Sequence, residues 1–208
     1  MSRVKEINRS SKHRKRNPVV YLICEGTETE IRYFKRFRTR YCHIDILPIP
    51  SQYKAADKLV QKVSSTLESN PYYPDEGDQI WCVFDRDENT DEMLKRAETL
   101  AGKNGYHIAY SNPAFELWFL LHFVNQTTEL TDCNAVIRQL KQKGRLENYE
   151  KSQDIYSILL EKQPEAIKRS EKRIAELHSK NLEILVRKSN PVTTVSELVK
   201  YLNQHRGS

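Results

Sequence analysis

Apolar runs and amphipathic stretches alternate along the first 125 residues of the chain. The run from Pro18 to Cys24 is continuously apolar and rich in β-branched residues, which is typical of a strand buried on both faces. Three further strand signals follow, at residues 43–49, 79–84 and 107–110. Helical periodicity lies between them, from a cap at Thr27 to about Arg40, over 54–68 and over 91–103. Strands separated by helices of this length predict an α/β fold: a parallel sheet of about four strands with crossover helices.

The strand signals become rare after Asn125. Helical patterns cover residues 132–143, 153–162, 164–179 and 193–203, and a short strand-like stretch at 182–186 precedes the last of them. Thr193 or Thr194 is placed to cap the last helix, and Glu197 to complete a capping box. We therefore predict a flexible tail at 1–17, an α/β core at 18–125 and a helical C-terminal extension at 126–208 packed on that core.

The net charge of +6 is concentrated in the tail. Residues 1–17 hold seven basic residues and one acidic residue, which leaves 27 basic and 27 acidic residues in the rest of the chain. Such a tail suits contacts with a phosphate backbone, and Arg14, Lys15 and Arg16 are its candidate nucleic-acid-binding residues. A solvated terminus without a partner explains the same composition.

Several classes of protein are excluded by the pattern. No apolar run reaches the roughly 20 residues that span a bilayer, and the N-terminus lacks the apolar stretch of a signal peptide. The four cysteines are scattered, without a CxxC pair or a spacing suited to zinc. We therefore expect a cytoplasmic protein without structural disulfides or membrane contact.

Acidic residues follow two of the predicted strands. Glu25 ends the first strand, and Asp85-Arg86-Asp87 ends the third. Because the carboxyl ends of strands in an open α/β sheet meet at one edge, we expect the three carboxylates to lie close together there. Such a group favours a hard divalent cation, Mg²⁺ or Mn²⁺. Each motif alone is also explained by turn chemistry or by capping of the next helix.

The stretch from Asn112 to Phe123 is apolar nearly all round and predicts a buried helix. It carries Glu116 near its start, where a buried carboxylate needs a partner or a metal. His122 lies six residues further on, which puts it on another helix face, and a satisfied core histidine is its simpler interpretation. Two other residues have two interpretations each. Glu30 is a candidate for the site, but its place at the start of a helix is explained by the helix dipole alone, and Lys151 could stabilise phosphate charge or be an ordinary surface lysine.

These stretches carry a resemblance to a family. The chain resembles the RloB-like proteins, bacterial Toprim-fold proteins associated with restriction–modification and phage-defence loci. The resemblance runs over nearly the whole chain, and the segments that carry it are 20–34, 83–88, 111–118 with 121–123, 149–151 and 190–194. It implies a Toprim fold in which Glu25, Asp85 and Asp87 bind Mg²⁺.

The resemblance also implies roles for other residues. Glu30, Glu116, His122 and Lys151 fall on motif positions, and a downstream lysine assists catalysis in related Toprim nucleases. Arg86 departs from the small residue common inside the DxD motif; it is a candidate for phosphate contact, and a side chain that points to solvent is the alternative. A topoisomerase needs a further domain that a chain of this length does not provide.

The leading hypothesis is a Mg²⁺-dependent nuclease of anti-phage defence. Glu25, Asp85, Asp87, Glu116 and Lys151 are its catalytic candidates, and Glu30 is a further metal ligand. DNA and RNA, including tRNA, remain open as substrates, and a regulatory protein partner fits the control that such an enzyme needs. The alternatives are a non-catalytic nucleic-acid-binding or adaptor subunit and, ranked lower, a DxD phosphatase.

Overall fold

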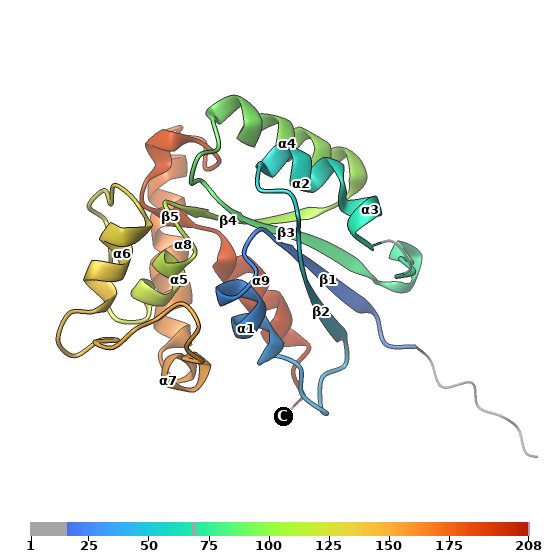
Figure 1. Ribbon diagram of the computed structural model, residues 1–208, viewed down its shortest axis with the longest axis horizontal. Helices are drawn as coiled ribbons and strands as arrows, with labels where there is room; N and C mark the ends of the chain where they lie inside the picture. Colours follow the sequence, from blue (N-terminus) through green and yellow to red (C-terminus); the bar gives the residue numbers. More distant parts are fainter. Residues whose placement is uncertain (1–15, 68–69, 208) are drawn as a thin grey trace, which may run out of the picture.

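Five strands form one sheet in the order β2-β1-β3-β4-β5 in the computed structural model, which describes residues 16–67 and 70–207 (Figure 1). The strands are β1 (Val19–Cys24), β2 (Asp45–Pro50), β3 (Gln79–Asp85), β4 (His107–Asn112) and β5 (Val192–Thr193). The first four are parallel, and β5 runs antiparallel to β4. The fold is therefore α/β with a mostly parallel sheet, as the alternating pattern predicts, and it is consistent with a Toprim-like arrangement.

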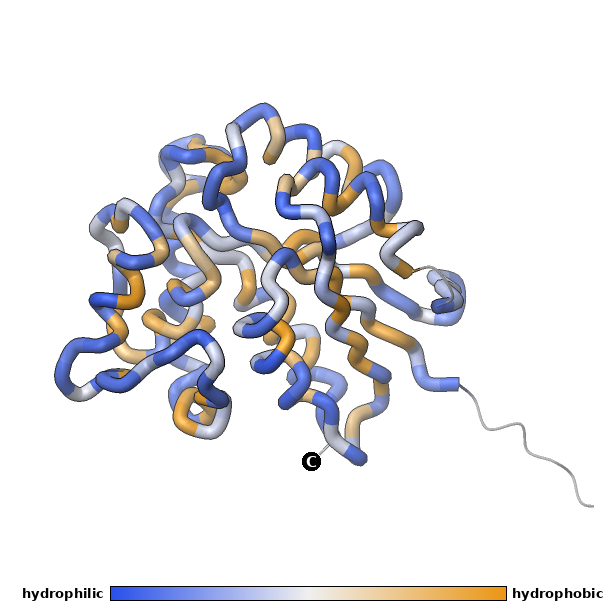
Figure 2. The backbone as a smooth tube through the Cα atoms, in the orientation of Figure 1, coloured by the Kyte–Doolittle hydropathy of each residue, from blue (hydrophilic) through white to orange (hydrophobic). Residues whose placement is uncertain are grey.

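Strand β1 forms the centre of the core because both of its faces are apolar and all six of its residues are buried. Val20, Leu22 and Cys24 belong to one hydrophobic cluster, and the alternate residues Tyr21 and Ile23 to the other. The hydropathy colouring shows hydrophobic segments along the inner strands and hydrophilic ones at the outer turns (Figure 2).

Helices cover both faces of the sheet. On one face lie α2 (Ala56–Gln61), α3 (Val63–Leu67) and α4 (Asp91–Asn104), and on the other lie α1 (Thr29–Lys35), α5 (Glu116–Leu121) and α9 (Val195–Gln204) (Figure 1). The remaining helices are α6 (Cys133–Leu140), α7 (Tyr156–Leu160) and α8 (Gln163–Ser179), with short 3₁₀ turns at Pro74–Glu76 and Arg187–Ser189. The long helix α8 packs against α5 and α9, so the C-terminal segment shares the core of the sheet.

Some predicted boundaries are wrong. Helix α1 begins at Thr29 after Glu28, so Thr27 is not its cap, and it ends at Lys35 rather than near Arg40. The predicted helix at 54–68 is two helices, because the backbone leaves the helical conformation at Lys62. The predicted strand at 182–186 is a loop whose apolar side chains pack on the sheet.

The predicted capping box at the last helix is also absent, although the Thr193 hydroxyl accepts a bond from the main-chain N–H of Val195, the first residue of α9, at 3.3 Å. The side chain of Thr194 makes no cap hydrogen bond; its Oγ1 accepts a bond from the main-chain N–H of Tyr110 in β4 at 2.9 Å. The edge of β4 has unpaired backbone groups beyond the short strand β5, and satisfying them takes precedence over capping.

No disulfide forms, since all four cysteines are free. Within the described ranges, we find no helix with the length and apolarity needed to cross a bilayer.

Candidate functional site

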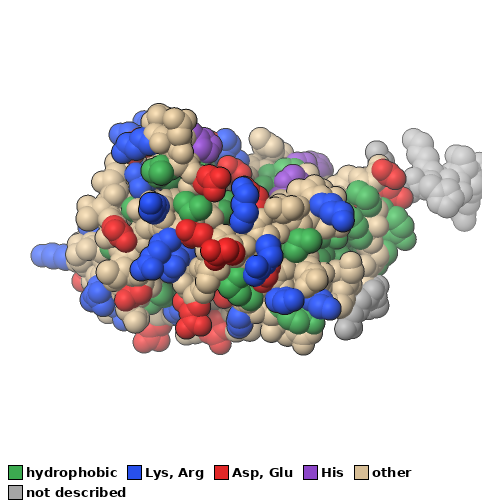
Figure 3. Space-filling view, turned by 90° about the horizontal axis from the view of Figure 1, so that it is seen from above, with side chains coloured by type: hydrophobic (Ala, Val, Ile, Leu, Met, Phe, Trp, Pro, Cys, Tyr) green, Lys and Arg blue, Asp and Glu red, His purple; other side chains and the backbone are tan. Residues whose placement is uncertain are grey.

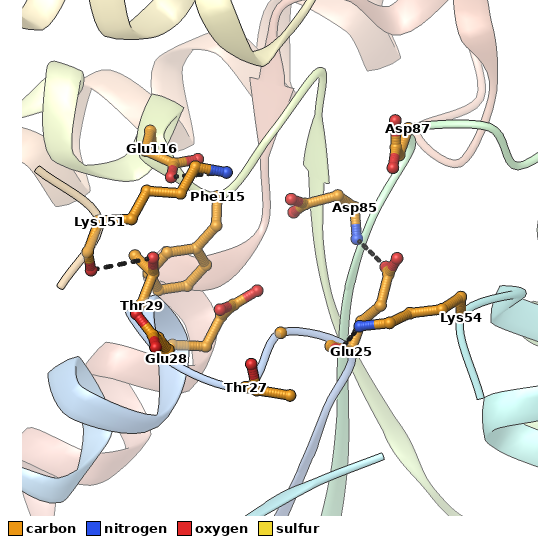
Figure 4. A pocket seen from close by; sticks show the side chains of 12 residues that line it. Glu25, Thr27, Glu28, Thr29, Lys54, Asp85, Asp87, Phe115, Glu116 and Lys151 are labelled. Atoms are coloured by element: carbon orange, nitrogen blue, oxygen red, sulfur yellow. Dashed lines mark hydrogen bonds and ion pairs between the residues drawn. The ribbon is translucent and has the colours of Figure 1, made fainter. Parts of the chain in front are cut away.

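A cavity of about 330 Å³ opens at the carboxyl ends of β1 and β3. It lies between the start of α1, the start of α5 and the loop after β2 (Figure 4). Twelve residues line it: Glu25, Gly26, Thr27, Glu28, Thr29, Glu30, Lys54, Asp85, Asp87, Phe115, Glu116 and Lys151. The structure thus brings together all the acidic candidates and Lys151 at one edge of the sheet.

Glu25 and Asp85 are joined directly. The main-chain N–H of Asp85 donates to Oε2 of Glu25 at 3.1 Å, and the N–H of Glu25 donates to the carbonyl of Val83 at 2.9 Å. The second bond continues the β1–β3 pairing by one residue, so the backbone position of Glu25 is fixed by the sheet. Both acids therefore have positions fixed by strand pairing rather than by a loop.

Glu30 reaches the cavity from the first turn of α1 and packs on Gly26. A Cβ atom at residue 26 would lie 2.0 Å from Oε2 of Glu30, far inside van der Waals contact. Only a residue without a side chain admits this carboxylate. Glu30 itself is 6% exposed, so the close approach keeps its carboxylate buried beside the strand end.

Glu116 is the first residue of α5 and is 2% exposed. Tyr149 donates its hydroxyl to Oε1 of Glu116 at 3.3 Å, and the Cys133 thiol donates to Oε2 at 3.4 Å. The ammonium of Lys151 lies 3.6 Å from Oε1. One cation and two neutral donors offset the free-energy cost of burying this carboxylate. Glu116 therefore has the partners that a buried acid requires.

Asp87 lies further out, in the turn after β3. Its side chain is exposed and its φ of +30° is left-handed, a conformation that aspartate tolerates better than most residues. Arg86 is half-buried and donates from Nη1 to the carbonyl of Asp87 at 3.0 Å. Both residues also line a second cavity of about 240 Å³ that adjoins the first through Asp85, Asp87 and Lys151.

Asp85 lies between two groups of charge. In Figure 4, Glu116 and Lys151 lie on one side of it and Glu25 and Lys54 on the other. Burial, followed by the charges of Glu30, Glu116 and Glu25, raises the pKa of Asp85 well above its ordinary value.

The neighbouring groups respond to the same environment. Burial raises the pKa of Glu25 to about 7, and burial with the charge of Glu116 raises the pKa of Glu30. Partial burial lowers the pKa of Lys151, but Glu116, Cys133 and Asp85 together outweigh this effect and the net pKa is raised. The cavity therefore favours an added positive charge.

Sequence reasoning missed Lys54. Its ammonium donates to the main-chain carbonyl of Glu25 at 2.6 Å, and its charge lowers the pKa of the Glu25 carboxyl against the effect of burial. Lys54 follows β2, which is parallel to β1 and adjacent to it, so the two strands end at the same edge. Only this strand order places Lys54 at the cavity, and the sequence alone does not reveal the order of the strands.

Asn89 was missed as well. This buried side chain donates to the carbonyl of Asp85 at 2.9 Å and accepts from the N–H of Ala56 at 2.8 Å. It fixes the turn after β3 against the start of α2, and so it positions Asp85. A DxD phosphatase usually carries a threonine or valine at this position, so the presence of an asparagine does not favour that alternative.

The donor set suits a hard cation, since its side-chain oxygens are all carboxylate. Across residues 16–67 and 70–207, however, no three Asp, Glu, His or Cys side chains form a ready-made group that could hold a metal ion. Glu25 and Asp85 lie at the centre, whereas Asp87 is exposed and Glu116 is paired with Lys151. The residues therefore fit a divalent cation in kind, and binding requires the carboxylates to draw together.

The remaining candidates lie elsewhere. Arg14 and Lys15 are outside the described residues. Arg16 lies at the start of β1, at the opposite end from Glu25, where its guanidinium pairs with Asp78 at 2.9 Å and with Glu76 at 3.1 Å. His122 is buried in the core, and its Nδ1 lies 2.9 Å from the carbonyl of Trp118, so it takes no part in the cavity.

Comparison with known proteins gives one match. The family model of the RloB-like protein matches residues 20–202, which is most of the chain. No curated protein matches the chain, and no solved structure matches it.

Proposed function

The chain belongs to the RloB-like protein family, and from that premise and the geometry of the cavity we propose that it is a divalent-metal-dependent nuclease of anti-phage defence. One observation carries the proposal. Asp85, fixed at the end of β3, lies among Glu25, Glu30 and Glu116 in a cavity whose opposite sides are formed by Lys54 and Lys151. Carboxylates for a cation beside lysines for phosphate are the two groups that phosphodiester hydrolysis needs.

Mg²⁺ or Mn²⁺ is the proposed cofactor. Glu25, Asp85 and Asp87 would hold it, and Glu30, which lines the same cavity, would add a fourth oxygen donor. A cation at this place supplies a low-pKa water and neutralises charge that develops on the phosphate.

The chain's own groups do the positioning. Glu116 holds the ammonium of Lys151 at 3.6 Å from its carboxylate, and the carbonyl of Lys151 accepts a bond from the Thr29 hydroxyl at 3.3 Å. The loop that carries Lys151 is thereby tied to the start of α1. From there we propose that Lys151 stabilises the phosphate in the transition state, with Lys54 on the other side.

The test is incubation of the purified protein with DNA, RNA and tRNA in Mg²⁺, Mn²⁺ or EDTA. The proposal predicts cleavage with metal, none in EDTA, and none in the Glu25→Ala/Asp85→Ala double variant, which still binds nucleic acid. An adaptor subunit predicts binding without metal-dependent cleavage by the wild-type protein. If no nucleic acid is cut with either metal, the proposed function is wrong.

A further inference from the structure

Helix α1 and the turn after it expose a row of basic side chains next to the cavity. Ile31, Tyr33, Phe34 and Phe37 are buried in the core, so the positions between them face outward. Five exposed residues there form what we call the basic face of α1: Arg32, Lys35, Arg36, Arg38 and Arg40. No acidic residue occurs between Ile31 and Ile44.

The basic face is continuous with the cavity. Thr29 lines the cavity and also a small depression on the side of α1 that Arg32 lines. Arg32 is one turn from Thr29, a rise of about 4.5 Å, and the rest of the row leads away from the site. A linear molecule that leaves the cavity past Thr29 meets these charges in succession.

Most of the charge on this face is not neutralised. Arg36 pairs with Asp154 at 3.4 Å, and Arg40 lies over the ring of Tyr41. Arg32, Lys35 and Arg38 make no ion pair within the part of the chain that the structure describes. Unpaired surface cations side by side repel one another, and an anionic partner relieves that repulsion.

The opposite face of the sheet is different. On α4, Lys95 pairs with Glu98 at 3.0 Å, and Arg96 pairs with Asp57 of α2 at 2.9 Å. The view from above shows basic and acidic side chains interspersed (Figure 3). The single-sign surface on α1 is thus a local feature and not a consequence of the overall charge.

We propose that the basic face of α1 binds the sugar–phosphate backbone of the nucleic acid whose scissile bond lies in the cavity. This inference rests on the proposed function, because a polyanion with a cleavable bond is what joins the two places. Arg32, Lys35 and Arg38 contact successive phosphates, without reading the bases. An anionic membrane would also attract these charges, but it gives no reason for their continuity with a carboxylate cavity.

The experiment measures binding apart from cleavage. The Arg32→Gln/Lys35→Gln/Arg38→Gln variant is titrated with labelled duplex and single-stranded DNA and RNA, with Ca²⁺ in place of Mg²⁺, over a range of salt. Its matched control is Lys58→Gln/Lys62→Gln/Lys103→Gln, which removes the same charge from exposed positions on the α2 and α4 side. Thermal unfolding of both variants verifies that they are folded.

We expect the α1 variant to bind more weakly than the control and with a smaller salt dependence. The slope of log affinity against log salt should fall by about 2.7 for a duplex and about 2.1 for a single strand if all three residues contact phosphate. Hydrolysis of bis(p-nitrophenyl) phosphate, which is too small to extend from the cavity to Lys35 and Arg38 on the basic face of α1, should be unchanged.

Four results would overturn the inference. They are equal binding by the two variants, no nucleic-acid binding by the wild type, slower hydrolysis of the small diester by the α1 variant, and weaker binding of phosphatidylserine vesicles with unchanged nucleic-acid binding. None of them decides the proposed function, which stands or falls on metal-dependent cleavage by the wild-type protein.

Discussion

The main-chain N–H of Asp85 donates a hydrogen bond of 3.1 Å to the carboxylate of Glu25, across the ends of two paired parallel strands (Figure 4). Two acids 60 residues apart in the sequence are thereby held next to each other by backbone geometry. The bond favours the ionised form of Glu25, but burial outweighs it and raises the pKa of Glu25 to about 7. The fold therefore accepts an unfavourable concentration of negative charge at this edge, which a cation would offset.

The first prediction concerns the stability cost of that charge. The folded state raises the pKa of Asp85, so folding disfavours the ionised form, and stability falls as pH rises above the unfolded pKa of about 4. At neutral pH in EDTA, Asp85→Asn should therefore raise the unfolding temperature by several degrees. For a protein of this length, each kcal/mol of added unfolding free energy raises the unfolding temperature by roughly 2–4 °C. Differential scanning calorimetry measures the shift.

In Mg²⁺ the wild type should instead have the higher unfolding temperature, because it gains stability from bound metal and Asp85→Asn does not. The control is Asp45→Asn, which removes one negative charge at an exposed position of β2 and should leave both measurements unchanged. A lower unfolding temperature for Asp85→Asn in EDTA would show that the acid stabilises the metal-free fold.

The second prediction uses the contact between Gly26 and Glu30. A Cβ at residue 26 meets the end of a flexible side chain, so Gly26→Ala should displace the Glu30 carboxylate with little effect on folding. We expect nucleic-acid cleavage to fall by roughly 10²-fold, the scale for a misplaced catalytic group.

The matched control is Gly102→Ala in α4, where a Cβ meets no atom within 4 Å. It should leave activity intact and stabilise the helix by about 1 kcal/mol. The effects of Gly26→Ala and Glu30→Gln should not add in the double variant, because both act through one carboxylate. Additive losses would mean that Gly26 acts on the site in another way.

The sequence predicted the sheet and the acidic edge well because both depend on local patterns. Continuous apolar runs identify buried parallel strands, and Glu25 and Asp85 follow two of them directly. The rule that ligands bind at the carboxyl ends of such strands then places both acids at one edge. Family membership is confirmed by the match over residues 20–202.

What the sequence did not predict depends on contacts between distant segments. Thr194 matched a helix cap, yet it bonds to Tyr110 because the edge of β4 needs a partner. Lys54 looked like an ordinary charged residue at the start of a helix, and only the strand order β2-β1-β3 brings it to the cavity. Neither relationship leaves a periodic signal in the chain.

The third prediction tests Lys54. Because its ammonium lies at the rim of the cavity and its charge acts on Glu25, Lys54→Ala should slow cleavage by about 10- to 100-fold without weakening Mg²⁺ binding. Lys54→Arg should retain part of the activity, since the positive charge is kept.

Lys58, four residues further along in α2 and bonded to Gln61, gives the control: Lys58→Ala should cleave at the wild-type rate. Isothermal titration with Mg²⁺ separates the two possible effects of Lys54. Weaker metal binding by Lys54→Ala would assign the residue to shaping the carboxylates instead of contacting phosphate.

The fourth prediction concerns His122, which is buried with Nδ1 donating to the carbonyl of Trp118 at 2.9 Å and with no partner for Nε2 among the described residues. Burial lowers the pKa of His122 to about 4 from its ordinary value of 6.5. Protonation is therefore disfavoured in the folded state, and stability is lost as pH falls from 6.5 towards 4. The resulting loss of unfolding free energy is about 3 kcal/mol, at 1.36 kcal/mol for each unit by which the pKa is lowered.

Urea unfolding of wild type and His122→Asn between pH 4 and pH 8 isolates this contribution, because the other titrating groups cancel in the difference. Asparagine can donate to the Trp118 carbonyl but does not titrate. We expect wild type minus variant to be constant above pH 7 and to fall by about 3 kcal/mol as the pH is lowered to 4. A constant difference over the whole range would mean that the folded state accommodates the charged imidazole. His122 would then again be a candidate functional residue.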